Sequence, residues 1–481
     1  MPRWAVAMNA DLAVGLVLLP MAGALVAFGL PAAYRRALAA AIALGWPLLL
    51  LPLTLLVLRD GSIAVVFGDW QPPLGIVWRI DGLALVMLWM HAAVGLAALV
   101  HAWPGFAPDR RAAATFWPLW LVLMTGANLA LVTADLFNLY VALELVTLTG
   151  IALVAITDST AALRAAMRYL LLAMLGSLMY LAGVGLTYAQ NGTLAMAGIT
   201  ALETTPLVLM LAGLMVKSAV FPLHVWLPPA YANAPGPVAA MLAAVVGKTA
   251  LIALWRVWWL AGDSASQALA MAIGVMGVAA IVYGSVAAML HPRLRMVVAY
   301  SSVAQIGLLL LLIPLAGSDA FVASGFHLLV HGLAKAAMFL AAANIVMALG
   351  SDWIRRLPGL DSKLPLEAFT LALAGITLIG LPPSGGWVSK WLLLQQARSN
   401  DQLVWMVAIL GGSLLSAAYV FRLLAMSCFH ASHHARRPIV TRPPRAGSLA
   451  ALLLALAAAL LGLNPTPMLN LLATAWPGAA S

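Results

Sequence analysis

Charged residues and cysteines are both scarce in this chain. Asp, Glu, Lys and Arg make up 8% of its 481 residues, against roughly 25% in a soluble domain, while 64% of the residues are hydrophobic. So little charge cannot cover a water-facing surface, which excludes a soluble enzyme, and a single cysteine, Cys428, excludes a disulfide scaffold. Because the apolar runs are continuous, without the polar alternation of a β-barrel, the sequence predicts an all-α polytopic membrane protein.

About fourteen apolar segments, each long enough for a transmembrane helix, follow one another along the chain. We expect them near residues 11–30, 37–58, 82–101, 113–133, 136–156, 169–188, 206–221, 237–260, 268–290, 297–315, 321–349, 368–393, 404–426 and 448–463. Residues 60–81 contain two prolines and three glycines and are expected to form an ordered hairpin outside the membrane.

The net charge of +10 comes from arginines beside the expected spans, not from one basic face, so we expect no nucleic-acid partner. The basic residues gather in loops that follow odd-numbered spans: Arg35, Arg36, Arg110, Arg111, Arg164, Arg168, Arg293, Arg295, Arg355, Arg356, Lys363, Arg436, Arg437, Arg442 and Arg445. This asymmetry predicts that the odd loops are cytoplasmic and that both termini lie outside. His430, His433 and His434 fall in the last of these loops and are expected to be solvated.

Lysine is distributed differently from arginine. Of five lysines, Lys217, Lys248, Lys335 and Lys390 fall within apolar segments, and only Lys363 does not. A desolvated lysine can lose its proton near neutral pH, whereas arginine stays charged. The partition therefore indicates sites inside the membrane whose protonation changes.

Glu144 is the one acid expected deep in a span, and it has an obvious partner in Lys217. An ion pair would offset the cost of burying either charge, and moving the carboxylate away would lower the proton affinity of the lysine. The pair is interpreted either as a switch or as a static structural ion pair.

His327, His331 and Lys335 recur at every fourth position and therefore share one stripe of a helix. Since histidine titrates near neutrality, the stripe predicts a water-bridged proton path. Two alternatives stay open: a zinc or copper site, for which the segment offers no further Cys or carboxylate, and a pair of core histidines.

Proline and glycine interrupt two of the expected spans, each beside a lysine. Lys217 precedes Pro222, Pro228 and Pro229, and Lys390 follows the glycine- and proline-rich run 380–386. The breaks are five spans apart, so their units run in opposite directions, which indicates two inverted five-helix repeats. We expect an N-terminal segment at 1–112, repeats at 113–260 and 261–427, and a loop with a final helix at 428–481. His224, at the first break, is either an access residue or an interface histidine.

Several runs resemble the antiporter-like membrane subunits of Mrp cation/proton antiporters and of complex I. They are DLFNLYVALE at 135–144, KSAVFPLHVWLP at 217–228, APGPV at 234–238, 327–340 and 380–391. The run at 68–77 resembles the outer hairpin of the D-type Mrp subunits, while Gly386 is more typical of hydrogenase- or quinone-reductase-type relatives. Lys390 differs from the complex I type that carries glutamate there.

The resemblance implies a proton-translocating subunit of a multisubunit Na⁺(K⁺)/H⁺ antiporter in the bacterial cytoplasmic membrane, working with other membrane subunits of the same complex. The alternative is a proton-pumping subunit of an NADH:quinone oxidoreductase or membrane-bound hydrogenase. It implies no cofactor and no resident metal in this chain, consistent with the lack of a cysteine set or a dinucleotide fingerprint. The proton would pass from Lys217, governed by Glu144, through Lys248 and the His327–His331–Lys335 stripe to Lys390. A non-conducting scaffold and a contributor to a quinone pocket remain as other classes.

Overall fold

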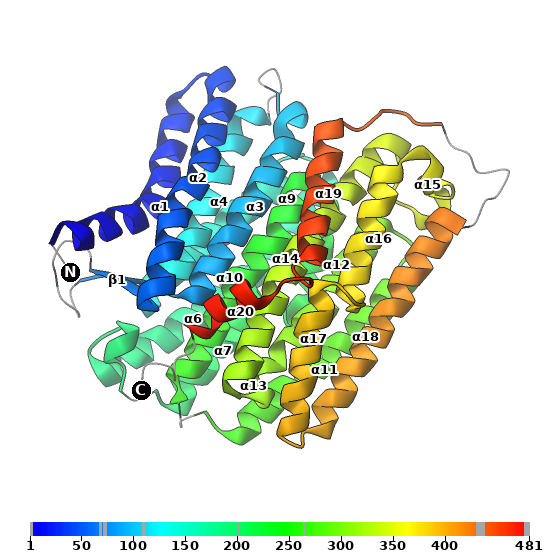
Figure 1. The fold of residues 1–481 in the computed structure, drawn as a ribbon. Helices are drawn as coiled ribbons and strands as arrows, with labels where there is room; N and C mark the ends of the chain where they lie inside the picture. Colours follow the sequence, from blue (N-terminus) through cyan, green and yellow to red (C-terminus); the bar gives the residue numbers. More distant parts are fainter. Residues whose placement is uncertain are drawn as a thin grey trace.

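Long helices and one small two-stranded hairpin make up the computed structural model (Figure 1). It describes residues 3–66, 70, 75–107, 112–200, 202–262, 265–429 and 438–475, with side chains from residue 11 onward. The first helices are α1 (Arg3–Gly29), α2 (Ala32–Asp60), α3 (Gly82–Gly105), α4 (Ala113–Val132), α5 (Leu136–Ala155) and α6 (Thr160–Asn191). The middle of the chain forms α7 (Thr204–Lys217), η3 (Leu223–Trp226), α8 (Leu227–Asn233), α9 (Gly236–Met241), the π-helical turn η4 (Leu242–Val246), α10 (Gly247–Leu260) and α11 (Gln267–Leu290). The rest forms α12 (Leu294–Leu310), α13 (Leu312–Leu315), α14 (Gly317–Leu349), α15 (Leu360–Lys363), α16 (Pro365–Ile379), α17 (Gly385–Ser399), α18 (Leu403–Leu424), α19 (Arg445–Leu460) and α20 (Thr466–Ala473).

Eleven helices among the described residues are long and apolar enough to cross a membrane, with α9–α10 and α12–α13 each counted as one span. Three shorter apolar helices, α7, α16 and α19, accompany them. The expectation of about fourteen spans is confirmed.

The spans form an inner and an outer layer. In the most apolar stretch of each span, every residue of α9–α10 and 89% of those of α14 are buried, against 39% in α6 and in α11. A helix that is apolar all round is stable when protein or lipid surrounds it. The longest helix, α14, runs through the middle of the bundle and packs against α3, α9, α12, α16, α17 and α19 (Figure 1). Polar groups on α10 and α14 therefore lie inside the protein, away from lipid.

Both predicted helix interruptions are present. The α-helix α7 ends at Lys217, and the chain passes through a 3-10 turn before α8 resumes at Leu227. Likewise α16 ends at Ile379 and α17 begins at Gly385. Proline removes backbone donors from both breaks, and Gly380, with φ of +85°, ends α16 in the left-handed conformation that glycine adopts at low cost.

Two pairs of neighbouring helices touch through their backbones. A Cβ atom at Gly213 of α7 would lie 2.4 Å from the carbonyl oxygen of Gly176 in α6. The same distance, 2.4 Å, would separate a Cβ at Gly307 of α12 from the carbonyl oxygen of Gly277 in α11. Small residues at such contacts let membrane helices approach closely, which is where van der Waals attraction between them is greatest.

The expected outer hairpin is confirmed in its described part. Strand β1 (Ile63–Val66) pairs antiparallel with β2 (Val77–Ile80), with Ile63 opposite Ile80. Of the residues expected there, Gly68, Asp69 and 71–74 lie outside the described residues, as do Arg110, Arg111, His430, His433, His434, Arg436 and Arg437.

Several basic residues expected in loops lie in the first turns of helices, among them Arg35 and Arg36 in α2 and Arg295 in α12. Arg164 and Arg168, expected in a loop, lie in the first turns of α6, which begins at Thr160 and not near Tyr169. The Ser159 side chain caps this earlier start by accepting the backbone N–H of Ala162 at 3.2 Å. Both arginines still lie near the N-terminal end of α6, so the unequal distribution of basic residues between the two faces is unchanged.

Candidate functional site

Glu144 and Lys217 form an ion pair between α5 and α7. The Lys217 Nζ atom lies 2.9 Å from Glu144 Oε1 and also donates to Thr147 Oγ1 at 3.2 Å. Ser177 of α6 donates a second hydrogen bond to Glu144 Oε1. The lysine side chain is 3% exposed and that of the glutamate 21%. Lys217 is therefore enclosed by protein, while Glu144 reaches the outer surface of this chain.

The helix interruption that follows α7 begins directly after Lys217 and is fixed by contacts with α6. Lys217 is the last residue of α7, and the carbonyl of Val216 before it accepts two hydrogen bonds, from the backbone N–H of Ala219 at 3.1 Å and from the indole N–H of Trp226 at 2.9 Å. Trp226 in turn stacks on Tyr169 of α6, with ring centres 4.0 Å apart. Ala219 within the break has φ of +55°, which costs a non-glycine residue about 1 kcal/mol. The interruption is thus held in place by specific contacts.

Lys248 lies in α10 immediately after the π-helical turn η4. Such a turn leaves a backbone carbonyl without its usual helical partner, and Lys248 Nζ donates to the carbonyl of Ala243, five residues earlier. Lys248 is buried and has no carboxylate partner among the described residues. The structure therefore keeps this lysine in a site that a neutral amine can occupy at little cost.

The stripe on α14 is buried along its full length. His327 lies 2.9 Å from Ser389 Oγ through Nδ1 and 3.1 Å from Gln305 Oε1 through Nε2. Its ring is stacked against that of His331, with centres 6.0 Å apart. Lys335 donates to the carbonyl of Val298 at 3.0 Å and to Ser301 Oγ.

His331 is the least satisfied member of this stripe. Neither of its ring nitrogens has a hydrogen-bond partner in the described part of the chain. The charges of Lys248, Lys335 and Lys390 all act on it. Buried polar atoms are nearly always paired, so an unpartnered imidazole is a site where a water molecule can bind.

Lys390 of α17 reaches back across the second break. Its Nζ donates to the carbonyls of Leu378 at 2.9 Å and Ile379 at 3.0 Å, the last residues of α16. The C-terminal end of a helix carries partial negative charge, which favours an ammonium group. A cavity of about 10 Å³ beside it, lined in part by Gln305 and Ser416, is of the size that admits one water molecule.

The predicted residues thus fall into two groups. Glu144 and Lys217 form the first, and Lys248, His327, His331, Lys335 and Lys390 form the second, connected by their mutual electrostatic interactions. No hydrogen bond joins Lys217 to Lys248 among the residues that the structure describes. His224 joins neither group: it is buried against the rings of Phe221 and Tyr283.

Neutral polar partners are what the sequence reasoning missed. Ser177, Thr147, Gln305, Ser301 and Ser389 hold the charged side chains, and single hydroxyls or amides in apolar segments are too common to single out in a sequence. Glu367 was also missed, because the expected span began at Ala368; the structure starts α16 at Pro365 and buries Glu367.

A second cavity, of about 500 Å³, lies at the C-terminal end of α10, whereas Lys248 lies at the N-terminal end of this helix. Arg79, Asp81 and Arg256 are among its lining residues. Arg256 Nη2 lies 3.5 Å from Asp81 Oδ2 and its Nη1 lies 3.4 Å from the carbonyl of Thr133. These two contacts hold the Arg256 side chain at this end of α10. Within the described residues there is no group of three or more His, Cys, Asp or Glu side chains suited to a metal.

Fold and site together define a class: a polytopic membrane protein with two interrupted helices and a line of buried lysines and histidines between them. The transmembrane family described as NADH:quinone oxidoreductase/Mrp antiporter matches residues 133–416, and the chain belongs to it. It is an antiporter-like membrane subunit.

Its relatives come from more than one kind of membrane complex. The chain is 35% identical over 396 residues, 77% of this chain and 78% of the relative, to the NADH-quinone oxidoreductase subunit N of Desulforudis audaxviator. It is 26% identical over 75% of both chains to the D-type subunit of the Na(+)/H(+) antiporter of Alkalihalophilus pseudofirmus. A chain in the structure of the Mrp complex from Dietzia sp. DQ12-45-1b superposes with a TM-score of 0.88 at 25% identity, over 96% of each chain.

Proposed function

We propose that this chain is the proton-translocating subunit of a multisubunit Na⁺(K⁺)/H⁺ antiporter. The observation that carries the proposal is the Glu144–Lys217 pair, an enclosed lysine whose only charged partner in the described chain is a carboxylate at the protein surface. Movement of Glu144 would lower the proton affinity of Lys217 and release its proton into the protein.

The proposed path continues laterally through the second group. Lys248 accepts the proton from the Lys217 side through water, since no direct hydrogen bond bridges the two lysines in the described chain. His331, under the influence of Lys248, Lys335 and Lys390, passes it on, and Lys390 exchanges it with the aqueous phase. His224 serves as an access residue at the first break or only packs against its aromatic neighbours.

Glu144 lies where a neighbouring subunit would contact this chain. Phe137, Val141 and Leu148, on the same side of α5, are 46%, 42% and 52% exposed. We infer that another membrane subunit covers this face and shifts the Glu144–Lys217 pair. The superposed chain belongs to a structure of a multisubunit Mrp complex, which supports such an arrangement.

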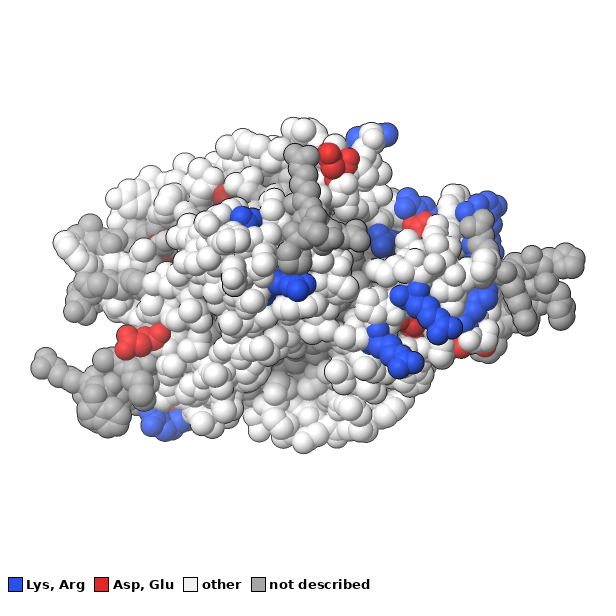
Figure 2. Space-filling view, turned by 90° about the horizontal axis from the view of Figure 1, so that it is seen from above, with Lys and Arg blue, Asp and Glu red and all other residues white. Residues whose placement is uncertain are grey.

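Orientation follows from charge. In Figure 1, α1 rises from the end of the molecule towards which α19 descends, so the described chain begins and ends on the same side. The opposite face, seen in Figure 2, shows basic side chains gathered over the α15 and α18 end. We propose that this face is cytoplasmic in a bacterial inner membrane and that both termini lie outside.

We also propose that residues 113–260 and 261–427 form the two inverted repeats. An N-terminal segment, 1–112, precedes them, and a loop with a final helix, 428–481, follows them.

The test is cation/proton exchange in everted vesicles from an antiporter-deficient host that expresses the whole complex. Sodium- or potassium-dependent collapse of the pH gradient is expected with the wild type and is expected to vanish with Lys217→Ala in an assembled complex. An assembled wild-type complex without exchange would contradict the antiporter assignment, and normal exchange by Lys217→Ala would contradict the relay.

One observation favours a second candidate, a redox-driven proton pump. The relative with 35% identity is named for an NADH-quinone oxidoreductase. In that case the same buried groups would move protons outward when electrons are supplied elsewhere in the complex. Proton pumping by wild-type vesicles that requires an electron donor and no added Na⁺ or K⁺ would select this candidate.

A further inference from the structure

A buried carboxyl group, Glu367, lies outside the proposed proton path. It stands in the first turn of α16 and is 3% exposed. Its Oε1 accepts hydrogen bonds from Asn344 Nδ2 of α14, at 3.3 Å, and from Ser448 Oγ of α19. No lysine or arginine pairs with it among the residues that the structure describes. Glu367 is therefore an ionisable group buried with neutral hydrogen-bond partners alone, which marks it as a candidate functional residue.

His101 of α3 fixes the orientation of this cluster. Its Nε2 lies 2.9 Å from Asn344 Oδ1, which directs the amide NH₂ group of Asn344 towards Glu367. The imidazole occupies a slot between two glycines: a Cβ at Gly236 would lie 3.3 Å from the ring and one at Gly447 3.2 Å. Nδ1 of His101 has no partner in the described chain. Four helices distant in sequence thus supply one polar site around Glu367.

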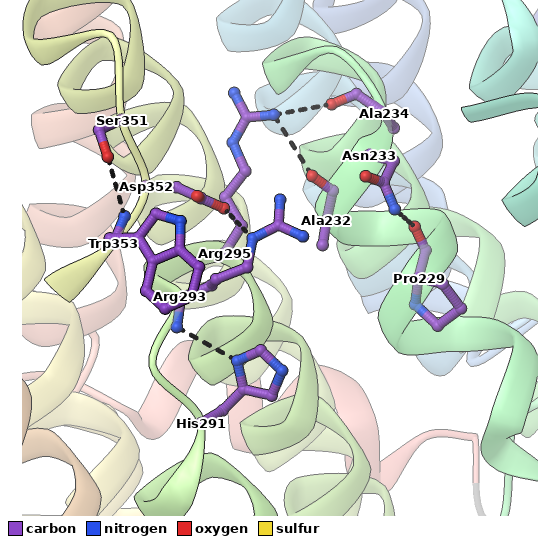
Figure 3. A network of polar contacts seen from close by, with 10 residues as sticks. All are labelled: Pro229, Ala232, Asn233, Ala234, His291, Arg293, Arg295, Ser351, Asp352 and Trp353. Atoms are coloured by element: carbon purple, nitrogen blue, oxygen red, sulfur yellow. Dashed lines mark hydrogen bonds and ion pairs between the residues drawn. The ribbon is translucent and has the colours of Figure 1, made fainter. Parts of the chain in front are cut away.

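The positive charges nearby are engaged elsewhere. Arg295 of α12 donates to the carbonyls of Ala232 and Ala234, at 3.4 and 3.3 Å, as Figure 3 shows. Arg293 lies 2.8 Å from Asp352 and its backbone N–H donates to His291 (Figure 3). Burial and the charge of Arg293 lower the pKa of His291. Neither arginine forms an ion pair with Glu367 among the residues that the structure describes.

From Glu367, one face of α16 leads to Lys390. Positions 367, 370, 374 and 377 are Glu, Thr, Ala and Thr and lie within roughly 80° of one another around the helix. Thr370 and Thr377 donate to carbonyls of their own helix, at 2.7 and 2.9 Å, which leaves their oxygens free to accept from water. The face ends beside Leu378 and Ile379, whose carbonyls hold the Lys390 ammonium group. About 17 Å of helix separate the two ends, so only a chain of water molecules could join them.

We propose that Glu367 is the group through which Lys390 exchanges protons with the aqueous phase on the face that carries the α14–α15 connection. In this scheme, Glu367 takes a proton from water on that face. Water molecules along Thr370 and Thr377 then carry the proton to the neutral amine of Lys390, and the Glu367 carboxylate takes up the next proton. The same steps in reverse release a proton to that face. The inference rests on the proposed function and adds to it the connection between the relay and one side of the membrane.

The test is Glu367→Gln in the complete complex, assayed in everted vesicles, where this face is expected to meet the medium. The transport rate is expected to fall roughly 100-fold, the effect of losing a positioned proton-transfer group. Added azide or formate is expected to restore it, since a small weak acid can deliver protons to the vacated site. Lys390→Ala should be slow and not restored, and Glu203→Gln, which alters an exposed acid before α7, should transport like the wild type.

Unchanged transport in Glu367→Gln, or a loss that weak acids do not restore in an assembled complex, would overturn the inference. Thr370→Val with Thr377→Val tests the path without touching the carboxyl group, because valine keeps the shape of threonine. This double variant is expected to be several-fold slower than Thr187→Val, in which a buried threonine with the same hydrogen-bond pattern on α6 is changed; equal rates would also overturn it. A wild-type complex that neither exchanges cations nor pumps protons would contradict the proposed function itself.

Discussion

Lysine and arginine at position 217 would make the same ion pair but would differ in what happens to the proton. Lys217→Arg keeps a cation within reach of Glu144, now 2.9 Å from the lysine, so the complex is expected to assemble. Because arginine does not release its proton in a protein, transport is expected to fall by roughly 100-fold. Vesicle exchange assays, normalised to the amount of assembled complex, measure this.

The same variant separates the two interpretations of the pair. A static ion pair would tolerate arginine, so wild-type rates in Lys217→Arg would favour a structural role. Arg256→Lys is the matched control, since Arg256 pairs with Asp81 at the far end of α10 and is not part of the proposed path.

Lys248 offers a test of the connection between the two groups of residues. Lys248→Met removes the titratable group but keeps a flexible side chain of similar length, and the carbonyl of Ala243 loses its donor. Transport is expected to fall at least tenfold, because no other titratable side chain among the described residues connects Lys217 with His331. Lys363→Met, which changes a lysine near the surface bonded to Pro358, should have little effect; equal rates in the two variants would remove Lys248 from the path.

At the scale of elements, the glycine contacts between helices are expected to affect the stability of the protein, because they involve no group of the proposed proton path. Gly213→Ala places a methyl group 2.4 Å from the carbonyl oxygen of Gly176, and Gly307→Ala does the same against Gly277. Overpacking of this kind costs about 1–3 kcal/mol, so each variant should yield less assembled complex with a lower melting temperature. Gly185→Ala and Gly411→Ala are matched controls, because nothing lies within 4 Å of either position; an unchanged melting temperature in Gly213→Ala would show that the two helices are not in close contact.

The elements that the sequence predicts well are those marked by strong local signals. The breaks at 218–226 and 380–384 were predictable because proline and glycine are incompatible with a continuing helix. The π-helical turn at 242–246 was not, because the residues LAAVV suit an ordinary helix and the turn depends on tertiary packing. The early start of α6 was missed because its arginines are typical of a loop beside a span, whereas Ser159 caps the helix before them.

In the site, the buried lysines were predictable from sequence because charge is rare inside a membrane, so each one stands out. Their arrangement was not. Only the folded chain brings Glu367, Asn344, Ser448 and His101 together, since they come from four separate helices. Sequence spacing within one helix predicts the His327–His331–Lys335 stripe, but it carries no information on which helix faces it.

For the whole molecule, the decisive prediction is its orientation, and the single cysteine makes it measurable. In a Cys428→Ser background, Ser362→Cys and Thr200→Cys place a thiol at exposed sites on opposite faces, one in α15 and the other between α6 and α7. The positive-inside rule places the first in the cytoplasm and the second outside. A membrane-impermeant maleimide should therefore label Thr200→Cys in intact cells and Ser362→Cys only in everted vesicles. The opposite labelling pattern would show that the orientation in the membrane is reversed. Glu367 would then lie towards the exterior, and the proposed direction of proton movement would reverse.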